Sequence, residues 1–406
     1  MVENRDFIYR VYVLRRSGSE AIANRKSVFQ NSHFEHESYM NSKMSADNEQ
    51  RKIDADEFYS QYHGHPAHHL KYIHDEMRRS AESSNTSSSI IWTAGDSSLD
   101  NKYWFSTSKN AVPGVYQKLL EPPRSKCDVT YWLNELMHQR RQESSGESVT
   151  PPFFSGAGAL NTAVEATTLN ERFGGHNLTK QDCIIRDNIR EEDILIVSIG
   201  GNDIALFPSV CTILSMVGII CCVPERMLKS GYTCYTCPYD DYCCGCGPSA
   251  ISCLGGMPPC LGYLTHLFGT RVENYIRSLV SKRKPRKILV CMIYFPDEDS
   301  RSSSWANGTL GALGYNSNPS KLQQVIKLGY KEATSRINIP GVEVIPVPLF
   351  RVLDGTNSSD YVARVEPSPS GGRKMAEFFL DLIDNDQSLG QFQANTPSTP
   401  LVINRT

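Results

Sequence analysis

Two short segments of the chain place a serine and an asparagine in glycine-containing turns, an arrangement that acyl-transfer chemistry uses. Gly95-Asp96-Ser97-Ser98-Leu99 follows an apolar run at 89–94. We expect Ser97 to lie just past a buried strand, with its N–H and its hydroxyl facing the same space, as a nucleophile requires. Gly200-Gly201-Asn202-Asp203 follows the apolar run 194–199, and there the Asn202 amide can point at an oxyanion. Either segment alone is equally explained as a simple turn.

A third segment runs from Asn161 to Thr168, after the glycine-rich stretch 155–158. Small residues let backbone N–H groups approach a ligand closely. Three such loops in order along one chain are less expected by chance than any one of them.

This ordered set resembles the SGNH, or GDSL-type, hydrolase family across residues 88–385, apart from a large insertion. The resemblance implies Ser97 as nucleophile and Asn202 as side-chain oxyanion donor. It also implies that the Ala166 N–H replaces the donor that a glycine usually supplies in the family. The expected activity is that of a serine esterase on an acyl ester, either of a lipid or of an acetylated carbohydrate.

The last segment departs from the family pattern, in which Asp-x-x-His precedes Pro-Ser, a glycine and a helix. Here Ala363 stands at the Asp position and Glu366 at the His position, while Pro367-Ser368 and the following glycines are retained. A solvated carboxylate is a weaker base than imidazole, so Glu366 can activate Ser97 only if burial raises its pKa. Asp360 is a nearby group that would share a proton with it.

Three alternatives to this esterase stay open at the level of sequence. The site has lost catalysis and binds a ligand, a histidine from 63–74 completes it, or the same groups serve an acyltransferase. Hydrogen-bond reach between Glu366 and the Ser97 hydroxyl separates an activated serine from a binding site.

The elements that must position these residues alternate along the chain. Apolar runs at 89–94, 194–199, 287–294 and 342–347 predict strands, and helical patterns occupy 131–142, 271–281, 321–336 and 372–383. Such alternation predicts a mostly parallel sheet covered on both faces, with the site at the carboxyl ends of its strands. We therefore expect a three-layer α/β/α sandwich, with the flavodoxin-like arrangement that the resemblance implies.

Three regions are predicted along the chain. Residues 1–85 are a polar extension, partly disordered with one docked helix. Residues 86–385 form the hydrolase-like domain, interrupted by an apolar and cysteine-rich insertion at 204–265. Residues 386–406 are a flexible tail.

The composition limits the partners and the compartment. A chain of 406 residues with 40% hydrophobic content and a net charge of -2 suits one large core and argues against a nucleic-acid partner. Arginines interrupt every apolar run in the first 19 residues, so we expect no signal peptide and a cytoplasmic protein with reduced thiols. No cofactor is expected for catalysis.

The insertion raises two further questions. Residues 204–223 contain no charged side chain, but a span there would separate the three loops across a bilayer. The remaining interpretations of this stretch are a buried helix, or a flap that binds an acyl chain or contacts a membrane surface.

Ten of the 13 cysteines lie between Cys211 and Cys260. A structural zinc, disulfides and unbonded thiols all fit that cluster, and acylation fits Cys221 and Cys222.

Overall fold

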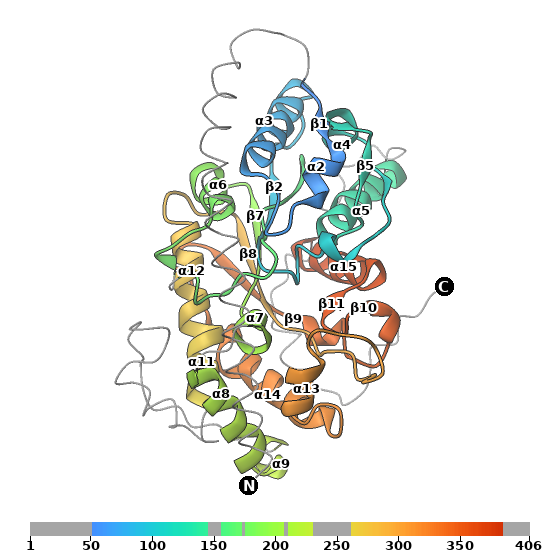
Figure 1. The fold of residues 1–406 in the computed structure, drawn as a ribbon. Helices are drawn as coiled ribbons and strands as arrows, with labels where there is room; N and C mark the ends of the chain where they lie inside the picture. Colours follow the sequence, from blue (N-terminus) through green and yellow to red (C-terminus); the bar gives the residue numbers. More distant parts are fainter. Residues whose placement is uncertain (1–50, 145–155, 173–174, 207–209, 230–260, 385–406) are drawn as a thin grey trace, which may run out of the picture. The chain divides into compact units, whose positions relative to one another are not determined.

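A five-stranded parallel sheet forms the core of the described part of the chain (Figure 1). The computed structural model describes residues 51–144, 156–172, 175–206, 210–229 and 261–384. The strands are β2 (Ile90–Gly95), β6 (Gly158–Asn161), β7 (Ile194–Ser198), β8 (Lys287–Met292) and β9 (Glu343–Pro348). Their spatial order is β6-β2-β7-β8-β9. Numbered along the chain, that order is 2-1-3-4-5, the flavodoxin-like order. The predicted fold class is confirmed.

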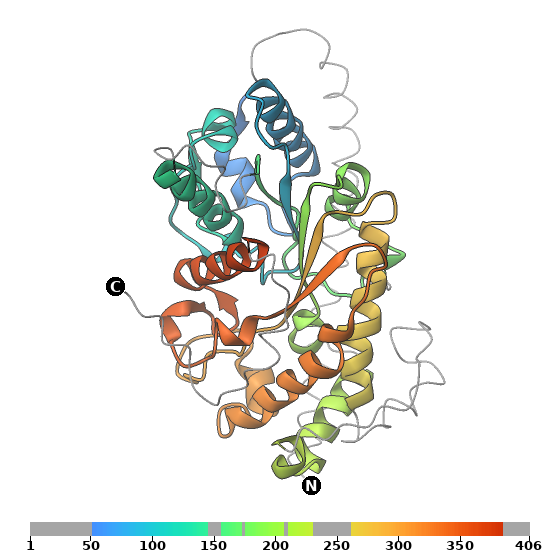
Figure 2. The ribbon, with the colours of Figure 1, turned by 180° about the vertical axis from the view of Figure 1, so that it is seen from behind.

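Helices cover both faces of this sheet. The main ones are α3 (Ala67–Ser83), α5 (Val129–Ser144), α6 (Lys180–Asn188), α12 (Val272–Leu279), α14 (Pro319–Glu332) and α15 (Pro369–Asp384). Figures 1 and 2 show α5 and α15 on one side of the strands and α3, α6 and α12 on the other. The arrangement is therefore three layers.

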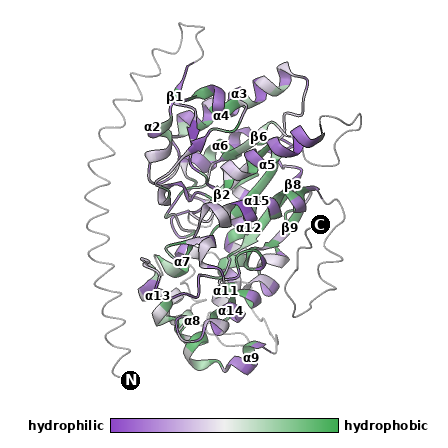
Figure 3. Ribbon diagram, turned by 90° about the vertical axis from the view of Figure 1, so that its right-hand side faces the viewer, coloured by the Kyte–Doolittle hydropathy of each residue, from purple (hydrophilic) through white to green (hydrophobic). Residues whose placement is uncertain are grey.

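Strand β7 shows why the strands read as unbroken apolar runs. Ile194 and Ile196 pack in the cluster that contains α5 and α15, whereas Leu195 and Val197 pack in the cluster that contains α3, α6, α12 and α14. All four side chains are fully buried. Because helices cover both faces of the sheet, side chains on either face are buried, and the strand does not alternate between apolar and polar residues. The apolar colouring of β8 and β9 in Figure 3 has the same cause.

Shorter elements complete the described part of the chain. The strands are β1 (Ile53–Asp54), β3 (Lys109–Asn110), β4 (Leu120–Glu121), β5 (Arg124–Ser125), β10 (Tyr361–Val362) and β11 (Glu366–Pro367). The helices are α2 (Ala55–Ser60), α4 (Val115–Leu119), α7 (Gly201–Ala205), α8 (Val210–Val217), α9 (Glu225–Lys229), α11 (Leu261–Thr265) and α13 (Asn307–Ala312). Two π-helices are η3 (Gly218–Cys222) and η4 (His266–Arg271).

The four predicted strands are present as β2, β7, β8 and β9, but β6 was not predicted as a strand. It has four residues, begins with a glycine and lies at the edge of the sheet. So short an edge strand lacks the long apolar run that marked the others. The four predicted helices correspond to α5, α12, α14 and α15.

The compact unit begins at Lys52, well before the predicted domain boundary at residue 86. Helix α3 is the docked helix expected in this region, and it buries Leu70, Ile73 and Met77. The helical apolar pattern of α3 is weak in the sequence, because histidines and charged residues surround these three side chains. An ion pair of 2.6 Å between Arg78 of α3 and Asp193, which precedes β7, also ties the segment to the sheet.

The described part of the insertion is helical and packs on the core. Met216 of α8 and Ile219 of η3 are buried, and these helices contact α11 and α14. No described helix combines the length and apolar character that crossing a bilayer demands. Cysteines 234–260, on which the zinc and disulfide alternatives rest, lie outside the described residues, as does the tail from residue 385.

Candidate active site

The turn after β2 holds Ser97 at the carboxyl edge of the sheet. Gly95 has a φ of +129°, and a Cβ there would lie 1.8 Å from the carbonyl oxygen of Ser198 in the neighbouring strand β7. Only glycine permits this approach. Asp96 then accepts hydrogen bonds from the backbone N–H and the hydroxyl of Ser98, which fixes the turn. Ser97 lies where β2 and β7 meet, the point at which the strand order reverses.

Ser97 and Glu366 lie 269 residues apart in sequence and meet in the structure. The Ser97 hydroxyl donates to Oε1 of Glu366 at 3.2 Å, and both side chains are buried. The predicted nucleophile and its predicted base are therefore within hydrogen-bond reach of each other.

The electrostatic setting of Glu366 favours the neutral carboxyl. Burial raises the pKa of Glu366 from 4.5 to about 8, with smaller contributions from Asp96 and Asp100, and the Ser97 hydrogen bond opposes the rise. Among the described residues, Oε2 of Glu366 has no hydrogen-bond partner. A carboxylate with a single donor in a buried site is far more basic than a solvated one, and a pKa of about 8 makes it at least as basic as imidazole.

A hairpin carries Glu366 to this position. Strands β10 and β11 pair antiparallel, and Ala363 and Arg364 between them have φ values of +49° and +65°. Arg364 is buried, and its guanidinium donates to the carbonyl of Asp297 and to the side chain of Asn307. Ala363 is thus part of a left-handed turn that the neighbouring arginine anchors.

Asp360, His65 and His74 were other candidate partners of Ser97, and their described hydrogen bonds go to other groups. The Asp360 carboxylate accepts from Lys374 at 2.6 Å and from Ser370, and none of its described hydrogen bonds reaches Glu366. His65 directs Nδ1 to a backbone carbonyl, and His74 directs Nδ1 to the carboxylate of the next residue. The described hydrogen bonds of these two rings do not involve Ser97.

Asn202 and the segment after β6 are joined at the same edge. The Asn202 amide donates to the carbonyl of Thr167 at 3.0 Å. Ala166 has a φ of +55°, the left-handed conformation that glycine adopts most easily. Asp203 accepts from the N–H of Leu169 at 2.8 Å, and burial raises the pKa of Asp203 to about 6. The predicted oxyanion donors Ala166 and Asn202 therefore belong to one connected loop pair.

Sequence reasoning missed Arg172, which supports the whole turn. This fully buried guanidinium donates to the carbonyl of Gly95 at 3.1 Å and to Asp182 at 2.9 Å. It thereby fixes the peptide that precedes Asp96. An arginine in an irregular segment carries no signal of burial, so only the fold identifies it.

A large apolar pocket adjoins Ser97. Its empty volume is about 910 Å³, open solvent included. Ser97, Asn202 and Glu366 line one part, and most other lining residues are apolar side chains from the helices around β8. Representative members are Met216, Leu264, Phe268, Leu310, Leu322, Val325 and Ile326. Met216 belongs to the insertion, so the insertion contributes a wall of this pocket.

A buried charged cluster lies behind the loop that carries Ala166. The Lys102 ammonium contacts Asp100 at 2.7 Å and Glu165 at 2.5 Å, all three fully buried. Burial opposes the charge on Lys102, but the two carboxylates outweigh that effect and raise the pKa of the ammonium. His65, Asp100 and Asp128 have ligand-type atoms within 4.8 Å of one another. The lysine on Asp100 does not fit a metal ion there.

Comparison with known proteins assigns the chain to no family. No protein-family model matches the sequence, and no curated protein matches it. The resemblance to SGNH hydrolases therefore stays a prediction, and the geometry described above is its support.

Proposed function

We propose that the protein is a serine esterase of the SGNH type, with Ser97 as nucleophile and Glu366 as base. The observation that carries the proposal is the 3.2 Å hydrogen bond from the Ser97 hydroxyl to the buried Glu366 carboxyl. The raised pKa of Glu366 supports its role as base, since a catalytic base works best with a pKa near the operating pH.

The reaction proceeds in two halves. The Ser97 oxygen attacks the ester carbonyl, and the Glu366 carboxylate takes the hydroxyl proton. The N–H groups of Ser97 and Ala166 and the Asn202 amide stabilise the oxyanion. The bond to the alcohol breaks, and Glu366 returns its proton to the departing alcohol. Water then attacks the acyl-enzyme, Glu366 takes the water proton and passes it to Ser97, and a carboxylic acid leaves.

The pocket supports a substrate with an apolar acyl chain. Its walls are largely apolar, and burial of each CH₂ group contributes about 0.8 kcal/mol. A substrate acetyl group would leave most of this surface without a partner. Of the two ester classes that the sequence left open, the lipid ester is therefore the one we propose.

A catalytically inactive binding protein is the second candidate, and one observation favours it. With a pKa of about 8, Glu366 holds its proton through most of the neutral range and then offers Ser97 no free carboxylate. The two candidates differ in the expected reactivity of Ser97 at alkaline pH: it rises in the esterase and stays absent in the binding protein.

The test is labelling with a fluorophosphonate probe from pH 6 to pH 9, followed by assays on esters of increasing acyl length. We expect labelling that grows with pH, disappears in Ser97→Ala and falls strongly in Glu366→Gln. Ser83→Ala is the matched control, because Ser83 is exposed on α3 and its hydroxyl donates to the carbonyl of Arg79, outside the turn that holds Ser97. Folded protein that takes up no label up to pH 9 overturns the esterase and leaves the binding protein.

A further inference from the structure

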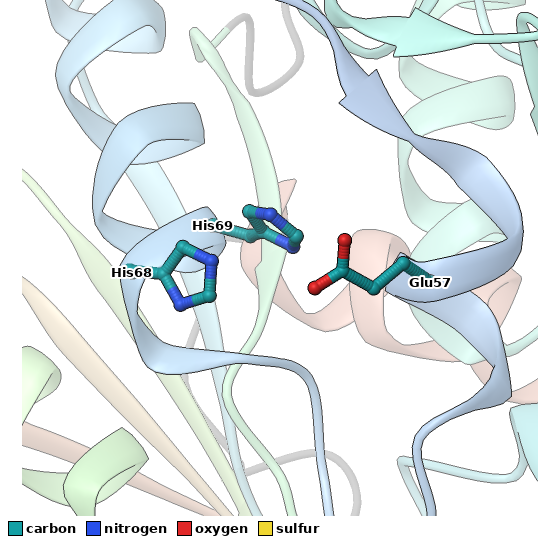
Figure 4. A group of neighbouring side chains, drawn as sticks. All are labelled: Glu57, His68 and His69. Carbon is teal, nitrogen blue, oxygen red and sulfur yellow. The ribbon is translucent and has the colours of Figure 1, made fainter. Parts of the chain in front are cut away.

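A second group of side chains, none of which takes part in the proposed esterase reaction, has the residue types of a zinc site. Glu57, His68 and His69 each offer one ligand atom, and these atoms lie within 4.8 Å of one another. Figure 4 shows the three side chains directed toward one another from α2 and from the first turn of α3. We propose that this group binds one Zn²⁺ ion.

The donor set fits zinc better than magnesium or calcium. Two imidazoles and one carboxylate are ligands that Zn²⁺ accepts in tetrahedral sites, whereas magnesium and calcium prefer oxygen alone. With bonds of about 2.1 Å, a tetrahedral zinc separates its ligand atoms by roughly 3.4 Å. Glu57 and His68 are exposed and His69 is buried, so any adjustment to that separation falls to the two exposed side chains. Water takes the fourth position.

The contrast with the buried group His65, Asp100 and Asp128 supports this choice. There the Lys102 ammonium contacts Asp100, and Asn161 donates to both carboxylates, so positive charge and donors already occupy the oxygens. The ion pairs described for the chain place no lysine or arginine against Glu57. Its carboxylate is thus available to offset the charge of an incoming ion.

The loop 61–66 joins α2 to α3. A zinc bound to Glu57 and to His68 and His69 would link the two helices on either side of this loop. This loop already reaches the active-site segment: the Gly64 N–H donates to Glu165 at 2.6 Å, and the His63 ring meets the Glu165 carbonyl at 3.2 Å. Ala166 follows Glu165 directly. Metal binding at Glu57 and His68 therefore restrains the loop that holds the segment of the proposed oxyanion donor.

Zinc is one of the alternatives that stay open for the cysteines between 234 and 260, so the test separates thiolate sites from this one. The full chain is alkylated with iodoacetamide under native conditions, its fold is checked by circular dichroism, and Zn²⁺ is titrated by calorimetry. We expect one equivalent bound, with affinity reduced at least roughly tenfold in Glu57→Gln and in His68→Ala, since even outer-shell changes cost about 10–100-fold. Both changes are at exposed positions and leave the core intact.

His138→Ala is the control, because His138 lies on α5, contacts Gln142 and does not belong to the group of Glu57, His68 and His69. No binding by the alkylated wild type, or equal affinity in the two ligand variants, overturns the site. Hydrogen exchange tests the coupling: zinc is expected to slow exchange across residues 61–66 in the wild type and not in Glu57→Gln. Unchanged exchange in a zinc-loaded wild type overturns the coupling to the loop.

Discussion

Replacing Glu366 by glutamine should stabilise the folded protein increasingly as pH rises. Below pH 4.5 the carboxyl is protonated in both the folded and the unfolded chain, so it contributes no pH dependence. Between 4.5 and about 8 the unfolded chain has released the proton while the buried Glu366 retains it, so the wild type loses stability as pH rises. Above pH 8 both states are ionised and the loss is complete.

The size of this effect follows from the two pKa values. At about 1.4 kcal/mol per pH unit, the interval from 4.5 to 7 costs the wild type about 3 kcal/mol, and the full interval to pH 8 costs about 5 kcal/mol. Glutamine does not ionise and escapes this cost. Its buried amide adds a penalty of its own, but that penalty is the same at every pH.

The measurement is urea unfolding of wild type and Glu366→Gln at pH 5, 6, 7 and 8, with reductant present. The stability difference between the two proteins, taken relative to its value at pH 5, is the quantity to follow. Glu121→Gln, at an exposed position, is the matched control and is expected to show little change across the series. A difference for Glu366→Gln that stays flat from pH 5 to 8 would refute the reasoning, since it means that Glu366 ionises as a solvated carboxyl does.

Four further outcomes are expected. Ester hydrolysis should rise roughly fifty-fold in kcat/KM from pH 6 to pH 8, because only the Glu366 carboxylate accepts the serine proton; a flat profile contradicts this. Ile326→Trp should fill the pocket and abolish hydrolysis of long acyl esters while short ones are still cleaved, as a chain-length series would show. Arg172→Met should destabilise the fold by about 3–5 kcal/mol in urea unfolding, whereas the same change at the more exposed Arg186 should leave the unfolding midpoint almost unchanged. Ala166→Gly should raise stability by about 1 kcal/mol by relieving the left-handed backbone, and an unchanged midpoint contradicts that strain.

The layers of the fold could be predicted from the sequence. Strands buried on both faces must be apolar at every position, and the helices between them must carry one apolar face, so both leave a pattern that is local in sequence. The edge strand β6 escaped because it is too short to show such a run. Helix α3 was expected only as a docked helix, since its apolar positions lie among histidines and charges.

The sequence also indicated which residues end up at the carboxyl edge of the sheet. Ser97 and Asn202 follow their strands directly, so any parallel sheet brings them to one edge. Ala166 follows β6, but β6 was not predicted as a strand, so only the resemblance placed Ala166 at this edge.

The chemical role open to Glu366 depends on contacts that no local pattern in the sequence predicts. Its distance to Ser97 depends on a hairpin that buried Arg364 anchors, and its raised pKa depends on burial by residues far away in sequence. Arg172 and the walls of the apolar pocket are equally invisible in the sequence. Burial and contact are properties of a packed interior, because they arise from side chains that meet only after the chain has folded.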